Sequence, residues 1–388
     1  MTPTILMLTP VMPSPTGGGS LIRAAAILES LTRIGRVVVV HVECWGTTAD
    51  SADRSWCRGK AAAIVVMQSG RVGSMPDVVL DAMQAAGLGQ RVDALYVFRQ
   101  MVGPVGLACR ERFAPSVSVL DLDDDECALS PCLVALQRER GDLEGASALE
   151  AGEDRRRTLR DILLRRFDRV FLSNPADVQS LRRDTGYGHV GLLPNVIGPA
   201  RAAEHVQRDP CRMLFLGTLS YLPNEDGVAW FVREALPRAR AIDPRMSLRV
   251  AGVGAPDGLR TLLSGDGVDF AGEVPDVAPE FAAAGMLVVP LRAGSGTRIK
   301  ILEAFSHGTP VVSTAIGAAG LDVTDGEHLL FADSPDAMAQ CCVRLARDTS
   351  LRESLARNAS QWVAHRHSLD VMHRMIAEAI EPRMGRQP

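Results

Sequence analysis

The sequence predicts an α/β protein with two parallel-sheet domains. Short, continuous apolar runs alternate with helical patterns along most of the 388 residues, as expected for strands that are covered on both faces. The alternation stops once, at a polar segment with two prolines, and then starts again. Strands that alternate with helices imply right-handed crossovers and a parallel sheet, and the chain is long enough for two cores.

The first predicted domain comprises residues 1–195. Its first strand, 5–8, is followed by three glycines and then by a helix over 20–34, which Ser20 can cap and Gly35 can end. Further apolar runs, with helical patterns between several of them, predict strands at 37–40, 62–66, 94–98, 117–120, 170–173 and 191–195.

A second predicted domain covers residues 213–368. The preceding segment, 196–212, is polar, contains two prolines and lacks a clear period, which is typical of a linker. The chain is therefore expected to consist of two α/β domains joined by a hinge. In the second domain the patterns predict strands at 213–217, 248–252, 286–290 and 309–313, and helices at 227–234 and 300–306.

Composition and charge exclude several classes of protein. Lys and Arg total 42 against 46 Asp and Glu, a net charge of −4 that argues against a nucleic-acid-binding face. No apolar run is long enough to span a bilayer, and the opening residues lack the basic region of a signal peptide. The eight cysteines show no CxxC pair and no spacing to histidine, so we expect no metal site, no disulfides and a cytoplasmic protein.

A ligand is expected where the strands end, because open parallel sheets bind ligands beyond the carboxyl ends of their strands. Two such domains joined by a hinge would leave a cleft between those ends. In the first domain, Gly17, Gly18 and Gly19 lead into a helix N-terminus, whose unpaired N–H groups attract anions. A flexible turn is an equally good interpretation of these glycines.

A second glycine loop, residues 294–300, opens a helix of the second domain with two cations, Arg298 and Lys300. Cations oppose the dipole at a helix N-terminus, and a bound phosphate would offset that cost. Lys300 is one of only two lysines in the chain, a scarcity that codon usage explains well. Glu303, one turn further on, can accept hydrogen bonds from both hydroxyls of a ribose; the alternative is a surface pair with Lys300.

Three further patterns are candidates for function. Small residues in 308–321 let the backbone approach a ligand closely. The acidic run 121–126, which includes Asp123 and Asp124, follows a strand and suits a Mg²⁺ site or a solvated acidic turn equally well. The arginine-rich helix expected over 149–166 suits an anionic membrane surface or a solvated face.

Segments of the second domain resemble the donor-nucleotide domain of the GT-B glycosyltransferases, most closely the retaining family 4 group. The similarity covers residues 213–375, whereas in the first domain it is limited to the glycine loop, the strand that ends at Ser173, and residues 193–195. The matching segments are GTLSYLPN at 217–224, GSGTRIKILEA at 294–304, GTPVV at 308–312 and GAAGLD at 317–322.

The resemblance implies two Rossmann-like domains that face each other across a cleft, with a nucleotide sugar bound by the second and an acceptor by the first. It also implies that a C-terminal helix within 369–388 crosses back onto the first domain. Asp123 or Asp124 stands where the family often has a histidine, and Ser295 replaces the first of two paired glutamates. Catalytic roles are expected for Arg298, Lys300, Asp123 and Asp124, and donor binding for Gly17, Gly18, Gly217, Thr218, Ser295, Gly296, Thr297 and Glu303.

The expected function is transfer of a sugar from a UDP- or GDP-linked donor to an acceptor hydroxyl, with retention. No metal or other cofactor is expected. Thr218 stands where the family has a basic residue, and Arg298 and Lys300 are expected to supply the positive charge instead. The acceptor is expected to be a small molecule or a lipid-linked glycan, in bacterial glycan or natural-product biosynthesis. A cytoplasmic protein is expected, with a peripheral position at the inner membrane as the alternative. Two alternatives stay open: a non-catalytic relative that binds a nucleotide sugar or a partner protein, and a nucleotide-sugar epimerase.

Overall fold

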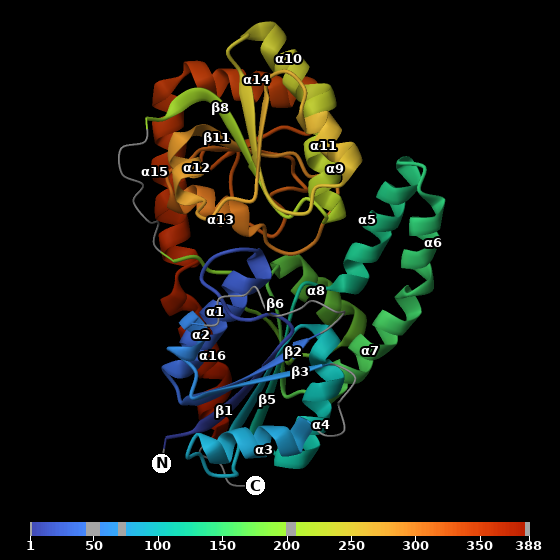
Figure 1. Cartoon of the computed structure of the whole chain (residues 1–388), viewed down its shortest axis with the longest axis vertical. Helices are drawn as coiled ribbons and strands as arrows, with labels where there is room; N and C mark the ends of the chain where they lie inside the picture. Colours follow the sequence, from blue (N-terminus) through green and yellow to red (C-terminus); the bar gives the residue numbers. More distant parts are fainter. Residues whose placement is uncertain (1, 44–54, 69–74, 199–206, 385–388) are drawn as a thin grey trace. The chain divides into compact units, whose positions relative to one another are not determined.

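Two compact α/β units make up the computed structural model (Figure 1), which describes residues 2–43, 55–68, 75–198 and 207–384. Contacts group Met1–Ala128, Glu150–Val196 and Leu369–Pro388 into the first unit, and Leu129–Leu149 and Ile197–Ser368 into the second. Within the described ranges, no helix combines the length and the apolarity needed to cross a membrane.

The first unit is built on a seven-stranded sheet in the order β3-β2-β1-β4-β5-β6-β7. All neighbouring strands pair in parallel, which confirms the predicted fold class. Every apolar run of the first predicted domain forms a strand here, although the last one ends at Leu192 rather than at residue 195. The strands are β1 (Thr4–Thr9), β2 (Arg36–Glu43), β3 (Ala63–Gln68), β4 (Ala94–Phe98), β5 (Val117–Asp123), β6 (Arg169–Leu172) and β7 (Val190–Leu192).

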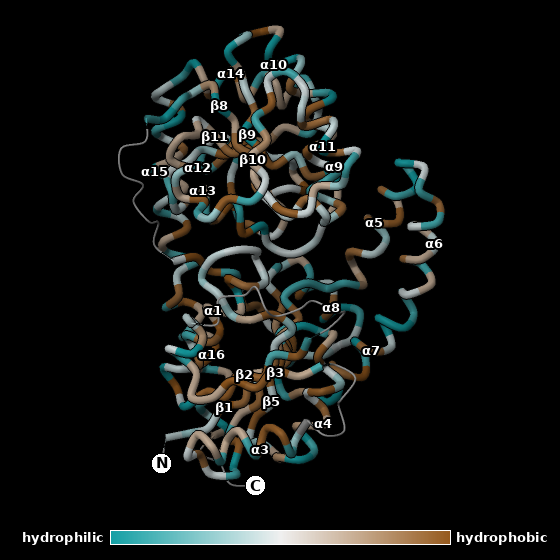
Figure 2. The backbone as a smooth tube through the Cα atoms, viewed as in Figure 1, coloured by the Kyte–Doolittle hydropathy of each residue, from teal (hydrophilic) through white to brown (hydrophobic). Residues whose placement is uncertain are grey.

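The strands of this sheet are apolar on both faces because a hydrophobic core lies on each side of it. In β1, Leu6 and Leu8 belong to one core cluster, whereas Ile5 and Met7 belong to the other. Successive side chains of a strand point to opposite faces, so both sets must be apolar. Figure 2 shows the resulting hydrophobic colouring along β2, β3 and β5.

Helices cover this sheet, and the first of them differs from the expectation at its start. Gly18, not Ser20, is the N-cap of α1 (Gly19–Thr32), and Ser20 lies in the first turn, where its hydroxyl accepts a hydrogen bond from Arg99 (2.9 Å). The other helices of the first half are α2 (Ser55–Arg58), α3 (Met75–Ala85), a 3₁₀ turn (Gln100–Val102), α4 (Gly103–Phe113), α5 (Glu126–Glu139), α6 (Leu143–Ala151), α7 (Glu153–Arg166) and α8 (Pro175–Thr185).

The C-terminal helix α16 (Leu369–Met384) belongs to the first unit and packs against α1. Its apolar face, which includes Met372 and Ile376, is buried in the same core cluster as Leu28 of α1. At the edge of this contact, Arg33 donates a hydrogen bond to Asp370 (2.7 Å). The end of the chain thus completes the core of the unit in which the chain begins.

The second unit contains a six-stranded parallel sheet in the order β10-β9-β8-β11-β12-β13. Its first strand begins at Asp209, so the end of the expected linker, 209–212, is already strand. The two edge strands, β10 and β13, were not expected: β10 is only partly buried, and β13 has two residues. The strands are β8 (Asp209–Leu216), β9 (Ser247–Ala251), β10 (Val268–Gly272), β11 (Ala284–Val289), β12 (Val311–Ser313) and β13 (Leu330–Phe331).

Helices of the second unit start where the sequence supplies proline or a polar cap. For example, α9 (Leu222–Trp230) begins five residues before the expected start at Gly227 because Pro223 fits the first turn of a helix. Residues 129–149, expected in the first domain, are grouped with this unit, where Arg140 donates to Glu225 (2.5 Å). The remaining elements are a π-helical turn (Phe231–Ala235), α10 (Leu236–Ile242), α11 (Asp257–Leu263), α12 (Ala278–Ala283), α13 (Ile299–Ser306), α14 (Pro335–Arg347) and α15 (Thr349–Arg366).

Candidate active site

The amino group of Lys300 lies at the carboxyl end of β8. Lys300 is in the first turn of α13, and its Nζ donates a hydrogen bond to Oδ1 of Asn224 (2.8 Å). The same Nζ lies 4.6 Å from the centre of the Phe215 ring, close enough for a cation–π contact. Because Phe215 is the penultimate residue of β8, the lysine reaches the sheet edge where ligands of parallel sheets bind.

Gly217, which follows β8, makes room for this arrangement. A Cβ atom at this position would lie 2.8 Å from Nδ2 of Asn224 and 2.9 Å from Nζ of Lys300. Those separations are far below ordinary contact distances, so any larger residue would displace one of the two side chains. A glycine at position 217, which was predicted to bind the donor, thus leaves room for the side chains of Asn224 and Lys300.

The protein environment shifts the pKa values of Lys300 and Glu303 in opposite directions, toward the same value. Burial and the nearby Arg298 lower the pKa of Lys300 to about 7, and burial raises the pKa of Glu303 to about 7. Both side chains are half-buried, so they do not form the solvated surface pair that the sequence left open. A lysine and a carboxyl group that titrate near neutrality are typical of functional sites.

Arg298 turns back onto the glycine loop. It is the N-cap residue of α13, and its guanidinium donates hydrogen bonds to the backbone oxygens of Gly296 (3.1 Å) and Ser295. A Cβ at Gly294 would overlap the same guanidinium, which explains the glycine there. The arginine therefore shapes the loop in this structure, whereas Lys300 faces the end of β8.

The loop also places polar groups beside the start of α13. Thr297 is buried, and the Ser295 hydroxyl is buried without a hydrogen-bond partner among the described residues. The N-cap side chain makes no capping hydrogen bond to the helix. Uncapped N–H groups of a helix N-terminus are suited to an anion.

Two neighbours of this site, Asp226 and Arg292, were not predicted from the sequence. The Arg292 guanidinium donates to both oxygens of the buried Asp226 carboxylate, at 2.9 and 2.7 Å. A fork of this kind fixes α9 against the loop that follows β11. No spacing rule connects residues so far apart in the chain, so only the structure brings them together.

The glycine motif near residue 317 supports a tightly folded loop after β12. A Cβ at Gly317 would lie 2.5 Å from Oγ of Ser313 and 2.5 Å from the backbone oxygen of Val289. The Gly317 amide donates to Oγ1 of Thr314 (2.9 Å), which itself donates to the backbone of Leu291 (2.5 Å). The small residues therefore let the backbone of this loop approach the end of β11 closely.

In the first unit, the acidic run at the end of β5 is neither solvated nor arranged as a metal site. Asp121, Asp123 and Asp125 are all buried. Asp125 pairs with Arg160 (3.0 Å), so the interpretation as a solvated turn is wrong. Among the described residues, no three His, Cys, Asp or Glu side chains come together as metal ligands would.

Arg99 is the partner of both acidic residues that were predicted as catalytic. Its guanidinium contacts Asp123 at 2.8 Å and Asp124 at 3.3 Å. Burial opposes ionisation of Asp123, but Arg99 and Arg23 outweigh it and hold the pKa of this carboxyl below its usual value. Both Arg99 and Asp123 have left-handed backbone conformations, with φ of 76° and 64°. Strained residues of this kind gather at functional sites.

The loop with Gly17 and Gly18 lies at the start of α1, near this cluster. Both glycines are exposed, and Gly17 has a φ of 104°, which favours glycine. Arg99 connects the cluster with the helix through its hydrogen bond to Ser20 (2.9 Å). The first unit thus brings the predicted Asp123 and Asp124 together on Arg99, which was not predicted, and Arg99 bonds to Ser20, two residues after Gly18.

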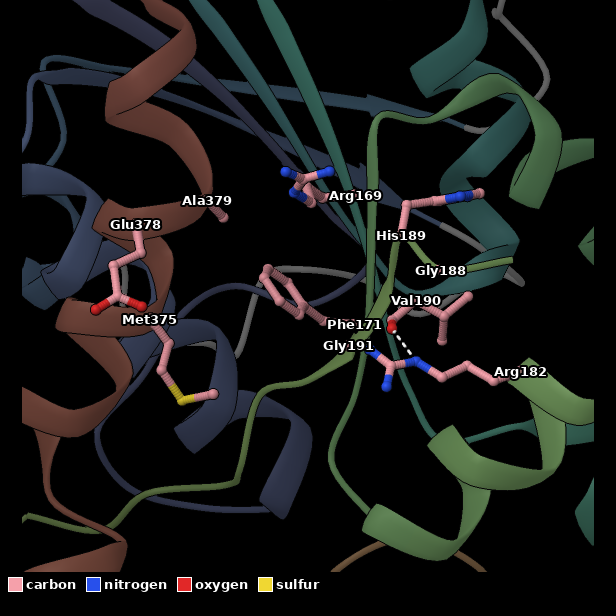
Figure 3. A pocket seen from close by; sticks show the side chains of 10 residues that line it. All are labelled: Arg169, Phe171, Arg182, Gly188, His189, Val190, Gly191, Met375, Glu378 and Ala379. Carbon is pink, nitrogen blue, oxygen red and sulfur yellow. Dashed lines mark hydrogen bonds between the residues drawn. The ribbon is translucent and has the colours of Figure 1, made fainter. Parts of the chain in front are cut away.

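A separate pocket of about 330 Å³ lies in the first unit, between α16 and the strands β6 and β7 (Figure 3). Arg169 and Val190, which line it, are the first residues of their strands, so it lies at the opposite edge of the sheet from Asp123. Arg182 borders it and donates to the backbone oxygen of Val190 (2.7 Å). None of the predicted site residues lines this pocket.

Comparison with known proteins identifies the second unit. Residues 210–348 match the family model described as glycosyl transferases group 1. A D-inositol 3-phosphate glycosyltransferase from a Nocardioides species is 28% identical over 247 residues, which cover 57% of this chain and 54% of that protein. The chain spans about half the length of the curated relatives it matches.

Solved structures extend the similarity in fold to the whole chain. A sucrose-phosphate synthase from Thermosynechococcus elongatus has a TM-score of 0.72 at 17% identity, with 98% of each chain covered. HepE from Anabaena in complex with UDP-glucose has a TM-score of 0.69 at 17% identity, covering 98% of this chain and 99% of that one. The chain therefore has the GT-B fold, and residues 210–348 of its second unit are similar to the group 1 glycosyltransferases.

Proposed function

We propose that this protein is a glycosyltransferase that moves a sugar from a nucleotide-diphosphate sugar to an acceptor hydroxyl. The observation that carries the proposal is the position of the half-buried Lys300, whose amino group lies at the end of β8 within the residues that match the group 1 family model. With a pKa near 7, this group can bind a diphosphate as a full positive charge, because an anion favours the protonated form.

The chemistry requires stabilisation of the leaving group. The bond between the anomeric carbon and the diphosphate oxygen breaks, and negative charge develops on that oxygen. Lys300 and the uncapped N–H groups of α13 are placed to stabilise this charge. The acceptor oxygen bonds to the anomeric carbon on the same face, its proton passes to the leaving diphosphate, and the configuration is retained without an enzyme nucleophile.

Glu303 is suited to hold the ribose of the donor. As a carboxylate it accepts hydrogen bonds from two neighbouring hydroxyls, and bonds of this kind favour its ionised form. We also assign donor binding to Gly217 and Thr218, in the loop after β8, and to Ser295, Gly296 and Thr297, in the loop before α13. Because Arg298 is bound to loop oxygens, we assign it the role of shaping this loop and Lys300 the contact with phosphate.

We place the acceptor at the first unit, where Asp123 and Asp124 meet Arg99 beside the loop of Gly17 and Gly18. Two curated relatives are named a D-inositol 3-phosphate glycosyltransferase and a phosphatidyl-myo-inositol mannosyltransferase. Their names support an acceptor rich in hydroxyls, free or linked to a lipid. The complex of HepE with UDP-glucose supports a UDP-linked donor, and a GDP-linked donor is the alternative to be tested beside it.

The experiment compares wild type with Lys300→Ala and with Lys60→Ala, a matched control at the only other lysine of the chain. Thermal unfolding is first measured with UDP-, GDP-, ADP- and TDP-sugars, because a bound donor stabilises the fold. Transfer to acceptor is then measured with the sugar that binds. We expect Lys300→Ala to lower kcat/KM roughly tenfold or more and Lys60→Ala to leave it unchanged.

The same assay separates the proposal from its rivals. Isomerised nucleotide sugar in place of transfer would indicate an epimerase, and binding without any product would indicate a non-catalytic relative. We further propose that no metal ion is needed, because Lys300 supplies the positive charge; activity should then survive EDTA. A Lys300→Ala enzyme with wild-type kcat/KM would contradict the proposed role of this lysine.

A further inference from the structure

The amide of Asn224 joins the loop after β8 to the amino group of Lys300. Its Nδ2 donates to the backbone oxygen of Thr218 (2.9 Å), and its Oδ1 accepts from Nζ of Lys300 (2.8 Å). We propose that Asn224 is a positioning residue, which holds the Lys300 amino group at the carboxyl end of β8 for the diphosphate. The proposal rests on the proposed function for the identity of the ligand and on these two contacts for the role of Asn224.

The two contacts fix the orientation of the amide. Thr218 offers a backbone oxygen, which only accepts, so the amide NH₂ must face it and the amide oxygen must face the lysine. The reverse orientation would direct NH₂ toward an amino group and a carbonyl toward a carbonyl. Asn224 is itself buried, with 8% of its surface exposed, so water cannot easily replace either bond.

A lysine needs such a partner because its side chain is long and flexible. The Lys300 amino group also contacts the face of the Phe215 ring, at 4.6 Å, which attracts a cation but does not direct a hydrogen bond. The missing side chain of Gly217 leaves the space that the pair occupies. Asn224 therefore supplies the directional contact that a fixed position requires.

The charges around Lys300 explain why this partner is an amide. Arg298, at the start of the same helix, disfavours the protonated lysine, and Glu303 favours it. From the α9 side, the carboxylates next to Asn224 are already paired, Glu225 with Arg140 and Asp226 with Arg292. Phe215 and Gly217 bring no charge from β8 and the loop after it. A neutral acceptor thus orients the amino group without neutralising it, which leaves its charge for the ligand.

The test uses the scarcity of lysine in this chain. Protein labelled with ¹³C and ¹⁵N in lysine gives signals from Lys60 and Lys300 alone, so the protonation of Lys300 is followed directly by NMR over pH. Wild type is compared with Asn224→Ala and Asn224→Asp, and Lys60→Arg assigns the signals. Circular dichroism shows that each variant is folded before its titration is interpreted.

We expect the two variants to move the Lys300 titration in opposite directions. Asn224→Ala removes the acceptor of the ammonium and should lower the midpoint from about 7 by about one pH unit. Asn224→Asp places a negative charge beside the ammonium and should raise the midpoint by about one pH unit or more. A purely structural role of Asn224 would not produce opposite shifts in two folded variants.

Asn358→Asp is the matched control, because it makes the same chemical change on α15, where the amide donates to the backbone of Glu327. The proposal is overturned when Lys300 titrates alike in wild type and both Asn224 variants, or when Asn358→Asp shifts it as far as Asn224→Asp does. Titrations repeated with UDP and with GDP should show a raised midpoint. Lack of response to both nucleotides would count against the proposed function, while the comparison of the variants still decides the role of Asn224.

Discussion

The guanidinium of Arg23 donates to both carboxylate oxygens of Asp121, at 3.2 and 2.8 Å, and neither side chain is exposed to solvent. The pair connects α1 to β5. Tyr96 donates to the same carboxylate (2.8 Å), and the backbone oxygen of Leu193 accepts from the arginine (3.0 Å). These hydrogen bonds are all made inside the core, to protein atoms. Loss of either partner therefore leaves the other buried without its main hydrogen bonds.

We predict that Asp121→Ala destabilises the protein strongly, because the buried Arg23 loses the carboxylate that accepts two of its hydrogen bonds and keeps only Asp123, at 3.6 Å, as a counter-charge among the described residues. The expected loss in the free energy of unfolding is about 3–5 kcal/mol. Urea unfolding measures it, with Glu111→Ala as the control: Glu111 pairs with Arg166 at 2.9 Å, but both side chains are exposed. The control should change stability by less than about 1 kcal/mol. Equal effects of the two variants would contradict the prediction.

The second prediction concerns the backbone of Asp123, whose φ is 64°. Asp123→Gly and Asp123→Ala both remove the ion pair with Arg99, so their difference reports on the backbone alone. Alanine usually gives a more stable protein than glycine by roughly 0.5–1 kcal/mol. Here the left-handed conformation costs alanine about 1–2 kcal/mol, so the glycine variant should be as stable as the alanine variant or more stable. Thermal unfolding of the two proteins decides; the usual order would mean that Asp123 is not strained.

The fold was predictable because its signal is local. Runs such as Ile5 to Leu8 are apolar in every position, and such runs form strands that are covered on both faces. The edge strands β10 and β13 lack this signal, since one is only half-buried and the other very short. The start of β8 was missed because Pro210 was interpreted as part of a linker.

The site was predictable only where its residues lie in one segment. The loop and helix around Lys300 and Glu303 could be found from glycine spacing and charge. Arg23 could not be found in this way. Within the pattern of α1 it looks like any surface arginine, and its partner Asp121 lies 98 residues away. Arg99 was missed for the same reason. Asn224 lies in the matching segment 217–224, but its contact with Lys300 could not be predicted because the two residues are 76 positions apart.

The third prediction is that Gly217→Ala disturbs the candidate site more than the fold. The added Cβ would lie 2.9 Å from Nζ of Lys300 and 2.8 Å from Nδ2 of Asn224, so it should break the hydrogen bond between them. Gly258→Ala is the control, since no atom lies within 4 Å of the added Cβ and the helix α11 should gain up to about 1 kcal/mol. Transfer activity and the NMR titration of Lys300 should change in Gly217→Ala alone. An unaltered Lys300 titration in that variant would show that the loop yields without disturbing the lysine.

The last prediction concerns the dependence of stability on pH. Burial and Arg298 lower the pKa of Lys300 from 10.5 to about 7, so the unfolded chain binds a proton here that the folded protein lacks between these values. A lowered lysine pKa means that the cost of burying the charge is fully present below about pH 7 and is lost as the pH rises toward 10.5. Lys300→Met, which replaces the lysine by an unbranched, uncharged side chain one atom shorter, removes this cost.

The advantage of Lys300→Met over wild type in the free energy of unfolding should therefore be largest near neutrality and should decline steadily as the pH rises. Urea unfolding from about pH 8 to about pH 10 measures the decline, because this range lies above most of the titration of Glu303, whose pKa is about 7. Lys60→Met serves as the control, because it makes the same change at a lysine whose side chain is 38% exposed. A difference between Lys300→Met and wild type that stays constant over this range would show that Lys300 is not desolvated in the folded protein, and the diphosphate would then meet an ordinary surface lysine.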